Sequence, residues 1–414
     1  MRAEIIAIGD ELTSGRILNT TSNYAAHCLF QAGHEIHAMH TIGDTPELIA
    51  ELLIQALKRV DVILVTGGLG ATDDDLTNEA VSRALARPAT LYPEILTRIQ
   101  EKLGSRGCVS LDKLAWLPQG AELLNPDTPM AGHLLIHDQV PIFFLPGVPS
   151  QMHYLMDKRV LPWLAAHEAT YPGLNSCQRL YKFFATSEMT INREIQELKL
   201  APEIDVGYYP VGHDVHLSLT LRGHDQDLTL QLFNRACSQV EHHFGQAIYG
   251  RDLETMESVV GDLLTRQGLT LALAESCTGG LISSRITTVA GSSTYFLGGV
   301  TSYADSMKEN CLGIEKELLS RHGAVSPETA AAMAMNIQRI SGADLTLSVT
   351  GIAGPGGGTL EKPVGTVHMG LMGPTGLNLH QFDFSGDRME IQAITAQTGL
   401  DLLRRHLLEL KTVS

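Results

Sequence analysis

The N-terminal part of the chain alternates between short apolar runs and longer stretches in which apolar residues recur every three or four positions. The short runs have the length and β-branched content of buried strands, and the periodic stretches are typical of amphipathic helices. Because strands and helices alternate, the pattern predicts a mostly parallel sheet with helices on both faces. The expected strands are residues 4–8, 35–41, 61–66 and 141–145, and the expected helices are residues 19–33, 46–59 and 77–86.

The pattern changes near residue 172. Residues 181–186 and 216–222 alternate like half-exposed strands, and helical periodicity covers residues 187–198 and 225–244. This combination predicts a small α+β unit with an antiparallel sheet. A turn-rich seam follows at residues 249–252, and α/β alternation then resumes. We therefore expect an α/β fold class with two α/β domains joined by a small α+β domain, with boundaries at about 1–170, 176–250 and 254–414.

Composition narrows the classes of partner. The net charge is −16, from 30 basic and 46 acidic residues, without a basic cluster, which argues against direct nucleic-acid binding. No apolar run approaches the roughly 18–20 residues of a membrane helix, and the N-terminus lacks the features of a signal peptide, so we expect no membrane contact and a cytoplasmic location. The six cysteines lie far apart without a C-x-x-C pair, which predicts free thiols and no structural zinc site.

The first candidate site follows the expected strand 61–66. Gly67, Gly68 and Gly70 let the backbone turn and approach a ligand closely, and three aspartates, 73–75, come next. For any one aspartate, capping of the following helix is as good an interpretation as metal binding. Three together exceed what capping needs, and oxygen-rich clusters of this kind suit Mg²⁺ or Mn²⁺.

A second acidic pair, Asp10 and Glu11, follows the first expected strand and precedes Asn19 and Asn23. Both clusters come at strand carboxyl ends, which share one edge of a parallel sheet, so they are expected to converge. Metal-assisted cleavage of a phosphoanhydride is the reaction class that this arrangement favours. The segment is neither a Walker A loop nor a G-x-G-x-x-G fingerprint.

The second candidate site begins in residues 269–280, where an apolar run ends at Glu275 and small hydroxyl, thiol and glycine residues follow. The pattern predicts a buried strand, a turn and a helix that starts near Gly279. Amides at a helix N-terminus attract anions, and Ser276, Cys277 and Thr278 are candidate nucleophiles or ligands at this turn.

Three further segments add polar groups to this second site. Ser293 precedes an apolar run that leads to Tyr303 and Lys308, strand 344–349 ends at Thr350, and Arg388 precedes the final helix. Serine with lysine, and without a well-placed His–Asp pair, points to Ser–Lys chemistry, because a partly desolvated lysine can act as a general base. Each residue alone fits a structural role better, since a lone lysine is usually solvated and a lone serine usually caps a helix. Together they predict a pocket.

These segments resemble the CinA family (competence/damage-inducible protein CinA) over essentially the full length. The resemblance implies an N-terminal domain similar to MoaB/MogA-type molybdopterin-binding proteins, a KH-like middle domain and a C-terminal nicotinamide mononucleotide deamidase domain. It also implies a homodimer that acts in pyridine-nucleotide recycling. The matching segments are residues 67–75, 145–149, 274–280, 298–303, 349–358, 363–366 and 386–388.

For the C-terminal domain the resemblance implies hydrolysis of nicotinamide mononucleotide to nicotinate mononucleotide and ammonia, without a cofactor. On the family's pattern Lys308 is the base, and we rank Ser293 slightly ahead of Ser276 as nucleophile. Cys277 falls behind both serines. The remaining roles are orientation of the substrate by Tyr303, binding of the carboxamide by Ser276 and Thr350, contact of Arg388 with the phosphate, and backbone contacts at Gly279, Gly280 and Gly351.

For the N-terminal domain the resemblance implies a metal-dependent ADP-ribose pyrophosphatase that yields AMP and ribose 5-phosphate, with Mg, Mn or Co as the divalent metal. Ala71, Asp73 and the stretch 128–133 depart from the family's pattern. The retained positions are Asp10, Glu11, Asp74 and Asp75 for the metal, and Asn19, Asn23, Gly67, Gly68 and Gly70 for the substrate. The middle domain lacks a G-x-x-G loop and a basic surface, so its KH-like fold does not indicate RNA binding.

Two alternatives remain at this point. The N-terminal domain could bind a pterin or a nucleotide without turning it over, in which case tight binding would occur without product. The whole chain could instead be an adaptor for competence or recombination. The acidic charge and the lack of a basic patch argue against direct contact with DNA in that role.

Overall fold

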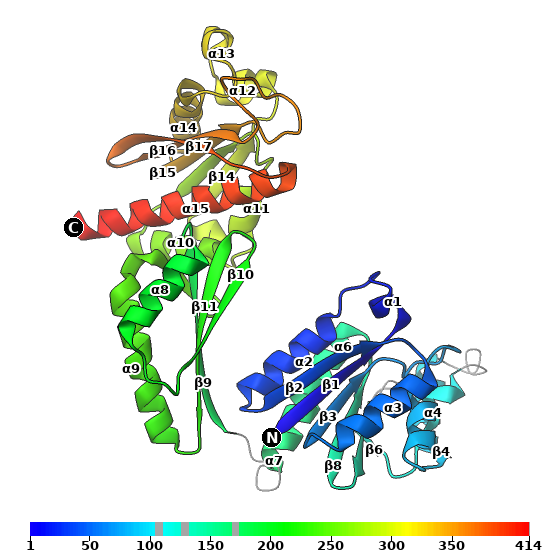
Figure 1. The fold of residues 1–414 in the computed structure, drawn as a ribbon. Coiled ribbons are helices and arrows are strands. Elements are labelled where there is room, and N and C mark those ends of the chain that lie inside the picture. The colour runs from blue at the N-terminus through cyan, green and yellow to red at the C-terminus, as the bar shows by residue number, and fades with distance from the viewer. Residues whose placement is uncertain (104–110, 126–131, 168–173, 414) are drawn as a thin grey trace. The chain divides into compact units, whose positions relative to one another are not determined.

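The computed structural model describes residues 1–103, 111–125, 132–167 and 174–413 (Figure 1). Two compact units are distinguished, residues 1–178 with 220–235 and residues 179–219 with 236–414. Cys108 and positions 128–131 of the stretch that departs from the family's pattern lie outside the described residues. Among the described residues, no helix is both long and apolar enough to cross a membrane.

The N-terminal sheet has six strands in the order β2-β1-β3-β8-β7-β6. The first four of these run parallel, as expected, whereas β7 is antiparallel to β8 and β6 is antiparallel to β7. The sequence pattern did not predict the β7–β8 hairpin. Its two turn residues, Asp138 and Gln139, both have positive φ without the glycine that usually marks such a turn. The strands are β1 (Arg2–Ile8), β2 (Glu35–Ile42), β3 (Val62–Thr66), β6 (Glu122–Leu123), β7 (His133–His137) and β8 (Val140–Leu145).

Helices cover both faces of this sheet because successive side chains of its buried strands point to opposite sides. Leu64 of β3 packs against α2, α6 and α7, and the next residue, Val65, packs against α3 and α4. The main helices of this region are α1 (Asp10–Thr13), α2 (Thr20–Gln31), α3 (Pro46–Leu57), α4 (Thr77–Ala84), α5 (Pro93–Leu103), α6 (Pro149–Leu155) and α7 (Leu161–Ala166). A hairpin of β4 (Ala89–Leu91) and β5 (Trp116–Pro118), the 3-10 turn Asp112–Ala115 and a π-helical turn Met156–Val160 complete it.

The middle of the chain forms a four-stranded sheet in the order β10-β11-β9-β12, with α8 and α9. The expected elements are present, but β10 was missed, because its half-exposed residues show no clean alternation. The turn-rich seam expected at residues 249–252 is wrong, because strand β12 occupies residues 248–251 and pairs with β9. Helix α8 begins where Ser187 accepts a hydrogen bond from the Thr190 amide, a typical N-cap. The bounds are β9 (Asn175–Phe184), α8 (Glu188–Leu198), β10 (Asp205–Val211), β11 (Asp214–Gly223), α9 (Gln226–Phe244) and β12 (Ile248–Arg251).

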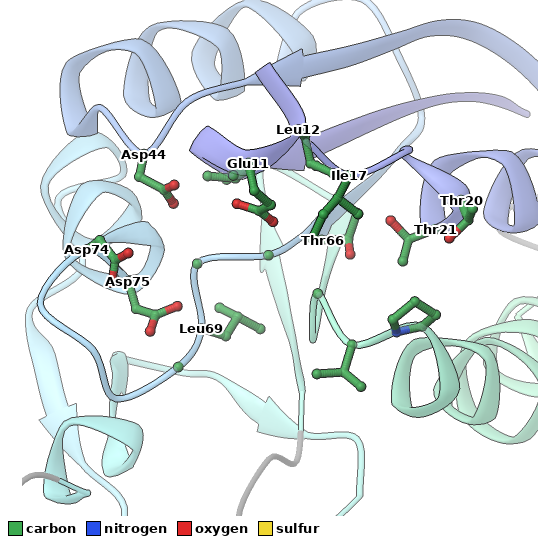
Figure 2. A pocket seen from close by; sticks show the side chains of 18 of the residues that line it. Glu11, Leu12, Ile17, Thr20, Thr21, Asp44, Thr66, Leu69, Asp74 and Asp75 are labelled. Atoms are coloured by element: carbon green, nitrogen blue, oxygen red, sulfur yellow. The ribbon is translucent and has the colours of Figure 1, made fainter. Parts of the chain in front are cut away.

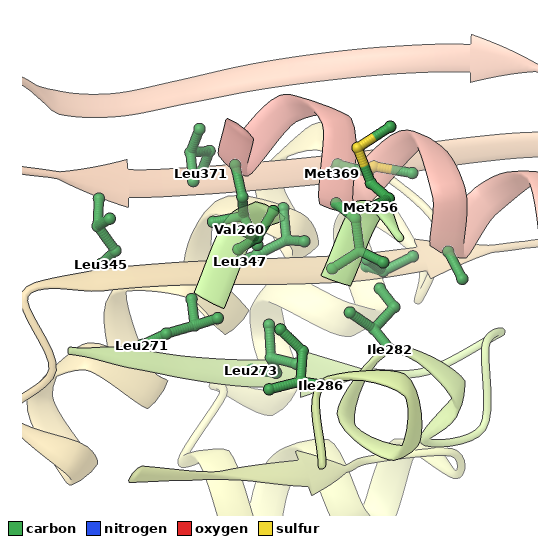
Figure 3. Close-up of a cluster of buried hydrophobic side chains, with 14 of the residues drawn as sticks. Met256, Val260, Leu271, Leu273, Ile282, Ile286, Leu345, Leu347, Met369 and Leu371 are labelled. Atoms are coloured by element: carbon green, nitrogen blue, oxygen red, sulfur yellow. The ribbon is translucent and has the colours of Figure 1, made fainter. Parts of the chain in front are cut away.

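The C-terminal sheet has five strands in the order β14-β13-β15-β16-β17, of which the first three are parallel and the last two antiparallel. Helices α12, α13 and α14 pack on one face, and α10, α11 and α15 pack on the other, where the larger core lies (Figure 3). The elements are α10 (Met256–Gln267), β13 (Leu271–Glu275), α11 (Leu281–Thr287), β14 (Phe296–Thr301), α12 (Asp305–Leu312), α13 (Lys316–His322), α14 (Pro327–Ser341), β15 (Leu345–Gly351), β16 (Thr366–Gly373), β17 (Gly376–Asp383) and α15 (Arg388–Val413).

Helix α15 joins several parts of this unit. Near its start the Gln392 amide donates to the Cys277 carbonyl at 2.7 Å. Further along, the Gln397 amide donates to Asp214 of β11 at 2.9 Å, and the Arg404 guanidinium donates to the Gln246 carbonyl at 3.0 Å. The helix therefore connects the turn after β13 to the middle sheet.

Candidate functional site

The C-terminal candidate site lies where β13, β14 and β15 end. The three strands are parallel, with Glu275 beside Thr301 and Val349, so the residues that follow them reach one edge of the sheet. Ser276 follows β13 and Tyr303 follows β14, and Thr350 is close to the end of β15. The sequence therefore placed these three residues correctly at strand ends.

A buried glutamate shapes the turn after β13. The Glu275 side chain is 1% exposed and accepts hydrogen bonds from the Ser283 amide and hydroxyl, the Ile282 amide and the Thr278 hydroxyl at 2.6–3.1 Å. Four donors compensate for the burial of a carboxylate at the start of α11. We assigned no role to Glu275 from the sequence, although an acidic residue between a buried strand and a helix can indicate that it accepts hydrogen bonds from the start of the helix. Its role is to fix the turn that carries Ser276.

Ser276 and Lys308 form the chemical centre of this edge. The Lys308 amine lies 3.0 Å from Ser276 Oγ and donates to the Ser302 carbonyl at 2.8 Å. The lysine is on α12 and only 1% exposed, and the serine is 7% exposed. A nucleophile within hydrogen-bond reach of its base is the geometry that serine activation requires.

Burial lowers the pKa of Lys308 below that of a free lysine, against the opposing influence of Asp305. Desolvation penalises the charged ammonium, so the neutral amine is present at a lower pH than in water. A neutral amine has the lone pair that accepts a proton from serine. Burial of the neighbouring Cys277 has the opposite effect on reactivity, because it raises the pKa of that thiol to about 12 and suppresses the thiolate.

Tyr303 and Arg388 come together at the rim of the same edge. The Arg388 guanidinium donates to the Gly354 carbonyl at 2.7 Å and to the Tyr303 hydroxyl. Tyr303 is 56% exposed and Arg388 is exposed as well, so both remain accessible to a ligand. The structure thus brings Ser276, Lys308, Tyr303 and Arg388 to one place.

Ser293 lies at the other end of the strands. It belongs to the 3-10 turn Ser292–Thr294 before β14, where the Leu271 amide at the start of β13 bonds the Tyr295 carbonyl. Ser276 follows the opposite end of β13, about 16 Å away at roughly 3.3 Å per strand residue. The structure therefore favours Ser276 over Ser293, because Ser293 comes before β14 whereas Ser276 comes after β13, and the two strands are parallel.

The other predicted binding residues of this site have local structural roles. The Thr350 hydroxyl is buried and donates to the Ala324 carbonyl at 2.6 Å. A side chain at Gly351 would come within 2.9 Å of the Thr366 carbonyl, so this glycine permits the pairing with β16. Gly279 and Gly280 have φ of 64° and 98°, which glycine adopts without strain in the turn before α11.

The N-terminal candidate site is a cavity of about 440 Å³ at the carboxyl ends of β1 and β3 (Figure 2). The glycine loop after β3 forms part of its wall, and two of these glycines are required sterically. A side chain at Gly67 would meet the Ile8 carbonyl at 2.1 Å, and one at Gly68 would meet Thr77 Oγ1 at 2.1 Å. The loop thus brings its backbone close to the cavity, as the sequence predicted.

Four carboxylates line the cavity, Glu11, Asp44, Asp74 and Asp75. Asp44 follows β2, and we did not predict it as a site residue. Its position shortly after a strand that ends at the same edge of the sheet could have indicated this role. Burial and the nearby charges of Asp10, Glu11 and Asp74 raise its pKa. Asp10 is not among the residues that line the cavity. It is hydrogen-bonded to Asp44: the Asp10 amide donates to the Asp44 carboxylate at 2.9 Å, and the Asp44 amide donates to the Asp10 carboxylate at 3.2 Å.

The three consecutive aspartates do not cap α4. That helix begins at Thr77 with Leu76 as its N-cap and without a capping side chain. Asp75 instead accepts from the Thr72 amide at 3.0 Å and from the Thr72 hydroxyl within the preceding turn. A hydrogen bond from Thr72 and the charge of Lys113 lower the pKa of Asp74. The capping interpretation is therefore wrong, and two of these carboxylates face the cavity.

Carboxylate oxygens are suitable ligands for a hard divalent cation. A bound cation would also relieve the repulsion between these negative charges. In the described part of the chain, however, no three acidic, histidine or cysteine side chains are close enough together to hold a metal on their own.

The two predicted asparagines are not among the described residues that line this cavity. Asn19 caps α2, where its side chain accepts from the Ser22 amide at 3.0 Å and donates to Thr41 Oγ1 at 2.9 Å. Asn23 is exposed on α2. Both side chains therefore lie outside the site that the sequence assigned to them.

Three family models match the chain in succession. Residues 4–166 match "Probable molybdopterin binding domain", residues 178–250 match "Damage-inducible protein CinA KH domain" and residues 253–407 match "CinA C-terminal domain".

Similar proteins extend this result to the full length. A "CinA-like protein" of Desulfotalea psychrophila is 52% identical over 99% of this chain and 100% of its own, and one of Citrifermentans bemidjiense is 39% identical over 100% and 99%. Among solved structures, the competence/damage inducible protein CihA from Agrobacterium tumefaciens is 40% identical, over 36% of this chain and 91% of that chain, with a TM-score of 0.35.

Proposed function

The chain belongs to the CinA family, and from this premise we propose that it is a pyridine-nucleotide hydrolase with two active sites. The C-terminal site deamidates nicotinamide mononucleotide to nicotinate mononucleotide and ammonia. The N-terminal site cleaves ADP-ribose to AMP and ribose 5-phosphate with a divalent metal.

The observation that carries the deamidase proposal is the buried Lys308 amine 3.0 Å from Ser276 Oγ. Ser276 attacks the carboxamide carbon while neutral Lys308 takes its proton and passes it to the amide nitrogen, which leaves as ammonia. Water then hydrolyses the acyl ester with the same lysine as base. Arg388, steadied by Tyr303 and the Gly354 carbonyl, supplies the positive charge for the substrate phosphate.

The test is the full-length protein with nicotinamide mononucleotide. We expect ammonia and nicotinate mononucleotide in equal amounts, measured by a coupled ammonia assay and by chromatography. The rate should be unaffected by a chelator, because the Ser–Lys route needs no metal. Nicotinamide mononucleotide that remains intact at high protein concentration would contradict the proposal.

The pyrophosphatase proposal rests on the cavity that the glycine loop and four carboxylates share. A divalent cation, Mg²⁺, Mn²⁺ or Co²⁺, held by Asp74, Asp75, Asp44 or Glu11 would neutralise the charge that develops on the pyrophosphate. The close approach of the loop backbone at Gly67, Gly68 and Gly70 leaves room for phosphate oxygens beside these carboxylates.

We expect AMP formation from ADP-ribose to stop when a chelator removes the metal and to return when Mg²⁺ or Mn²⁺ is added. Asp75→Asn should lower the rate about 10- to 100-fold, because it removes a carboxylate from the cavity. Chromatography of AMP gives the rate.

The matched control for this experiment is Asp73→Asn, two positions away, because Asp73 is exposed and does not line the cavity. Its rate should stay within twofold of the wild type, and ammonia release should be normal in both variants. Equal losses in the two variants, or AMP formation that ignores the chelator, would contradict a metal at this cavity.

A second candidate for the N-terminal region is a module that binds a pterin or a nucleotide without turnover, which the "Probable molybdopterin binding domain" match favours. Saturable binding of ADP-ribose without AMP would identify it. We further propose that the protein works as a homodimer on small nucleotides in the cytoplasm, where its described cysteines, all free, remain reduced.

A further inference from the structure

The cavity lined by Glu11, Asp44, Asp74 and Asp75 is called the acidic cavity below. A second cavity of about 450 Å³ adjoins it in the N-terminal unit. The two cavities share Gly70 and Asp75 in their walls. A side chain at Gly70 would meet Asp75 Oδ2 at 2.3 Å, so the bare glycine allows the Asp75 carboxylate to lie against the loop where the two cavities adjoin. Because both cavities have these two residues in their walls, one ligand that spans them is expected to contact both.

Trp116 gives this second cavity an aromatic surface. It is the first residue of β5 and pairs with Leu91 across the β4–β5 hairpin. Its side chain is 46% exposed where it lines the cavity. An exposed indole face in a cavity is a stacking surface for a flat heteroaromatic ring, and base stacking on aromatic side chains binds nucleotides in many proteins.

Two polar side chains in the same wall carry atoms without partners. Asn78 Oδ1 and Ser82 Oγ are buried and make no hydrogen bond to any residue that the structure describes. They are one turn apart on the same face of α4, and both residues line the cavity. Buried polar atoms without partners are rare and costly, and a small rotation toward a ligand would satisfy both. An asparagine amide can pair with the amino group and ring nitrogen of adenine.

Three cations line the second cavity, Arg83, Arg87 and Lys113, and Arg83 is paired with the Glu79 carboxylate. Lys113 lines the second cavity and donates to the Thr72 carbonyl in the turn that carries Asp74 and Asp75. Arg87 is fixed by hydrogen bonds from its guanidinium to the carbonyls of Gln119 and Ile136, at 3.2 and 3.0 Å. The charge of Lys113, beside the turn of Asp74 and Asp75, suits a phosphate close to the shared wall, with an uncharged ring beyond it.

We propose that the second cavity holds the adenine of the substrate, stacked on Trp116 and hydrogen-bonded by Asn78 and Ser82. This inference rests on the proposed cleavage of ADP-ribose at the neighbouring acidic cavity. The pyrophosphate then lies across Gly70 and Asp75, and the ribose 5-phosphate end occupies the acidic side. Trp116 thereby determines which end of the substrate enters which cavity, and AMP is the product that leaves from the second cavity.

The test measures binding of AMP to the full-length protein by calorimetry in Mg²⁺ buffer. Trp116→Ala should weaken AMP binding about 5- to 150-fold, the range for loss of one base–aromatic stack. Trp116→Phe keeps a ring and should stay within a few-fold of the wild type. Ribose 5-phosphate has no base, so its affinity should be the same in all three proteins.

Two further readouts separate this inference from the proposed function. In the ADP-ribose assay Trp116→Ala should raise KM with little change in kcat. If the wild type binds AMP through Trp116 but forms no AMP from ADP-ribose, the adenine site stands and the pyrophosphatase proposal fails. Equal affinity of wild type and Trp116→Ala for AMP, no AMP binding by the wild type, or an unchanged KM would overturn the adenine site.

Discussion

Replacing Ser276 by alanine is expected to reduce ammonia release from nicotinamide mononucleotide by about 10³-fold or more. The hydroxyl is the group within reach of the Lys308 amine, at 3.0 Å, and the alanine methyl cannot form the acyl ester. Substrate binding should change little, because the contacts proposed for the phosphate come from Arg388. The loss should therefore fall on kcat and leave KM nearly unaltered.

Ser293→Ala is the matched control, since it removes the same hydroxyl at the opposite end of β13 and β14. We expect its kcat to stay within about threefold of the wild type, as is usual for an exposed surface substitution. Mass spectrometry after rapid quenching should find the acyl adduct on the peptide that contains Ser276. Inactive Ser293→Ala beside active Ser276→Ala would show that the Ser276–Lys308 pair is not the catalytic one.

Lys308→Met is expected to lower kcat about 10²- to 10⁴-fold, the contribution of a general base. The wild-type rate should rise with pH as the lysine loses its proton and level off above its pKa. That rise should come at lower pH than for a free lysine, because burial lowers the pKa of Lys308. A pH–rate profile for the wild type and the variant would show the rise in the first and its absence in the second.

Stability measurements separate a chemical loss from unfolding in this variant. A lysine whose pKa is lower in the folded state binds fewer protons there, so its penalty on folding is full below that pKa and disappears as the pH rises from it to the pKa of a free lysine. Methionine carries no such penalty in the same buried position. Lys308→Met should thus be at least as stable as the wild type at neutral pH, measured by thermal unfolding. A variant with wild-type kcat would contradict the assignment of Lys308 as base.

The sequence pattern predicted the architecture well because buried strands and amphipathic helices leave different periodicities. The strands that were missed have weak local signals, such as the half-exposed β10 and the hairpin with a glycine-free turn at Asp138 and Gln139. Packing against neighbouring strands decides these elements, and such contacts leave little trace in the local sequence.

The candidate sites were predicted in part for a similar reason. Ser276, directly after β13, and Asp75, in the loop after β3, were found because strand ends share an edge of the sheet. Ser293 was ranked too high because its position before a parallel strand was not weighed. The lining role of Asp44 and the hydrogen bonds of Glu275 depend on what a buried group contacts, which the sequence does not show. The three aspartates were ambiguous because a cap and a ligand use the same residue types, and only the observed turn decides between them.

The contacts of α15 limit where residues can be inserted into or deleted from this helix. Gln392 contacts the turn that carries Ser276, whereas Gln397 and Arg404 contact Asp214 and Gln246 from positions about 140° and 120° further around the helix, since each residue turns it by about 100°. One residue inserted between Gln392 and Gln397 would rotate the second pair away by that angle and shift it by about 1.5 Å. The helix thus sets the spacing between these contacts. The segment between Gln392 and Gln397 should tolerate substitutions but neither insertions nor deletions.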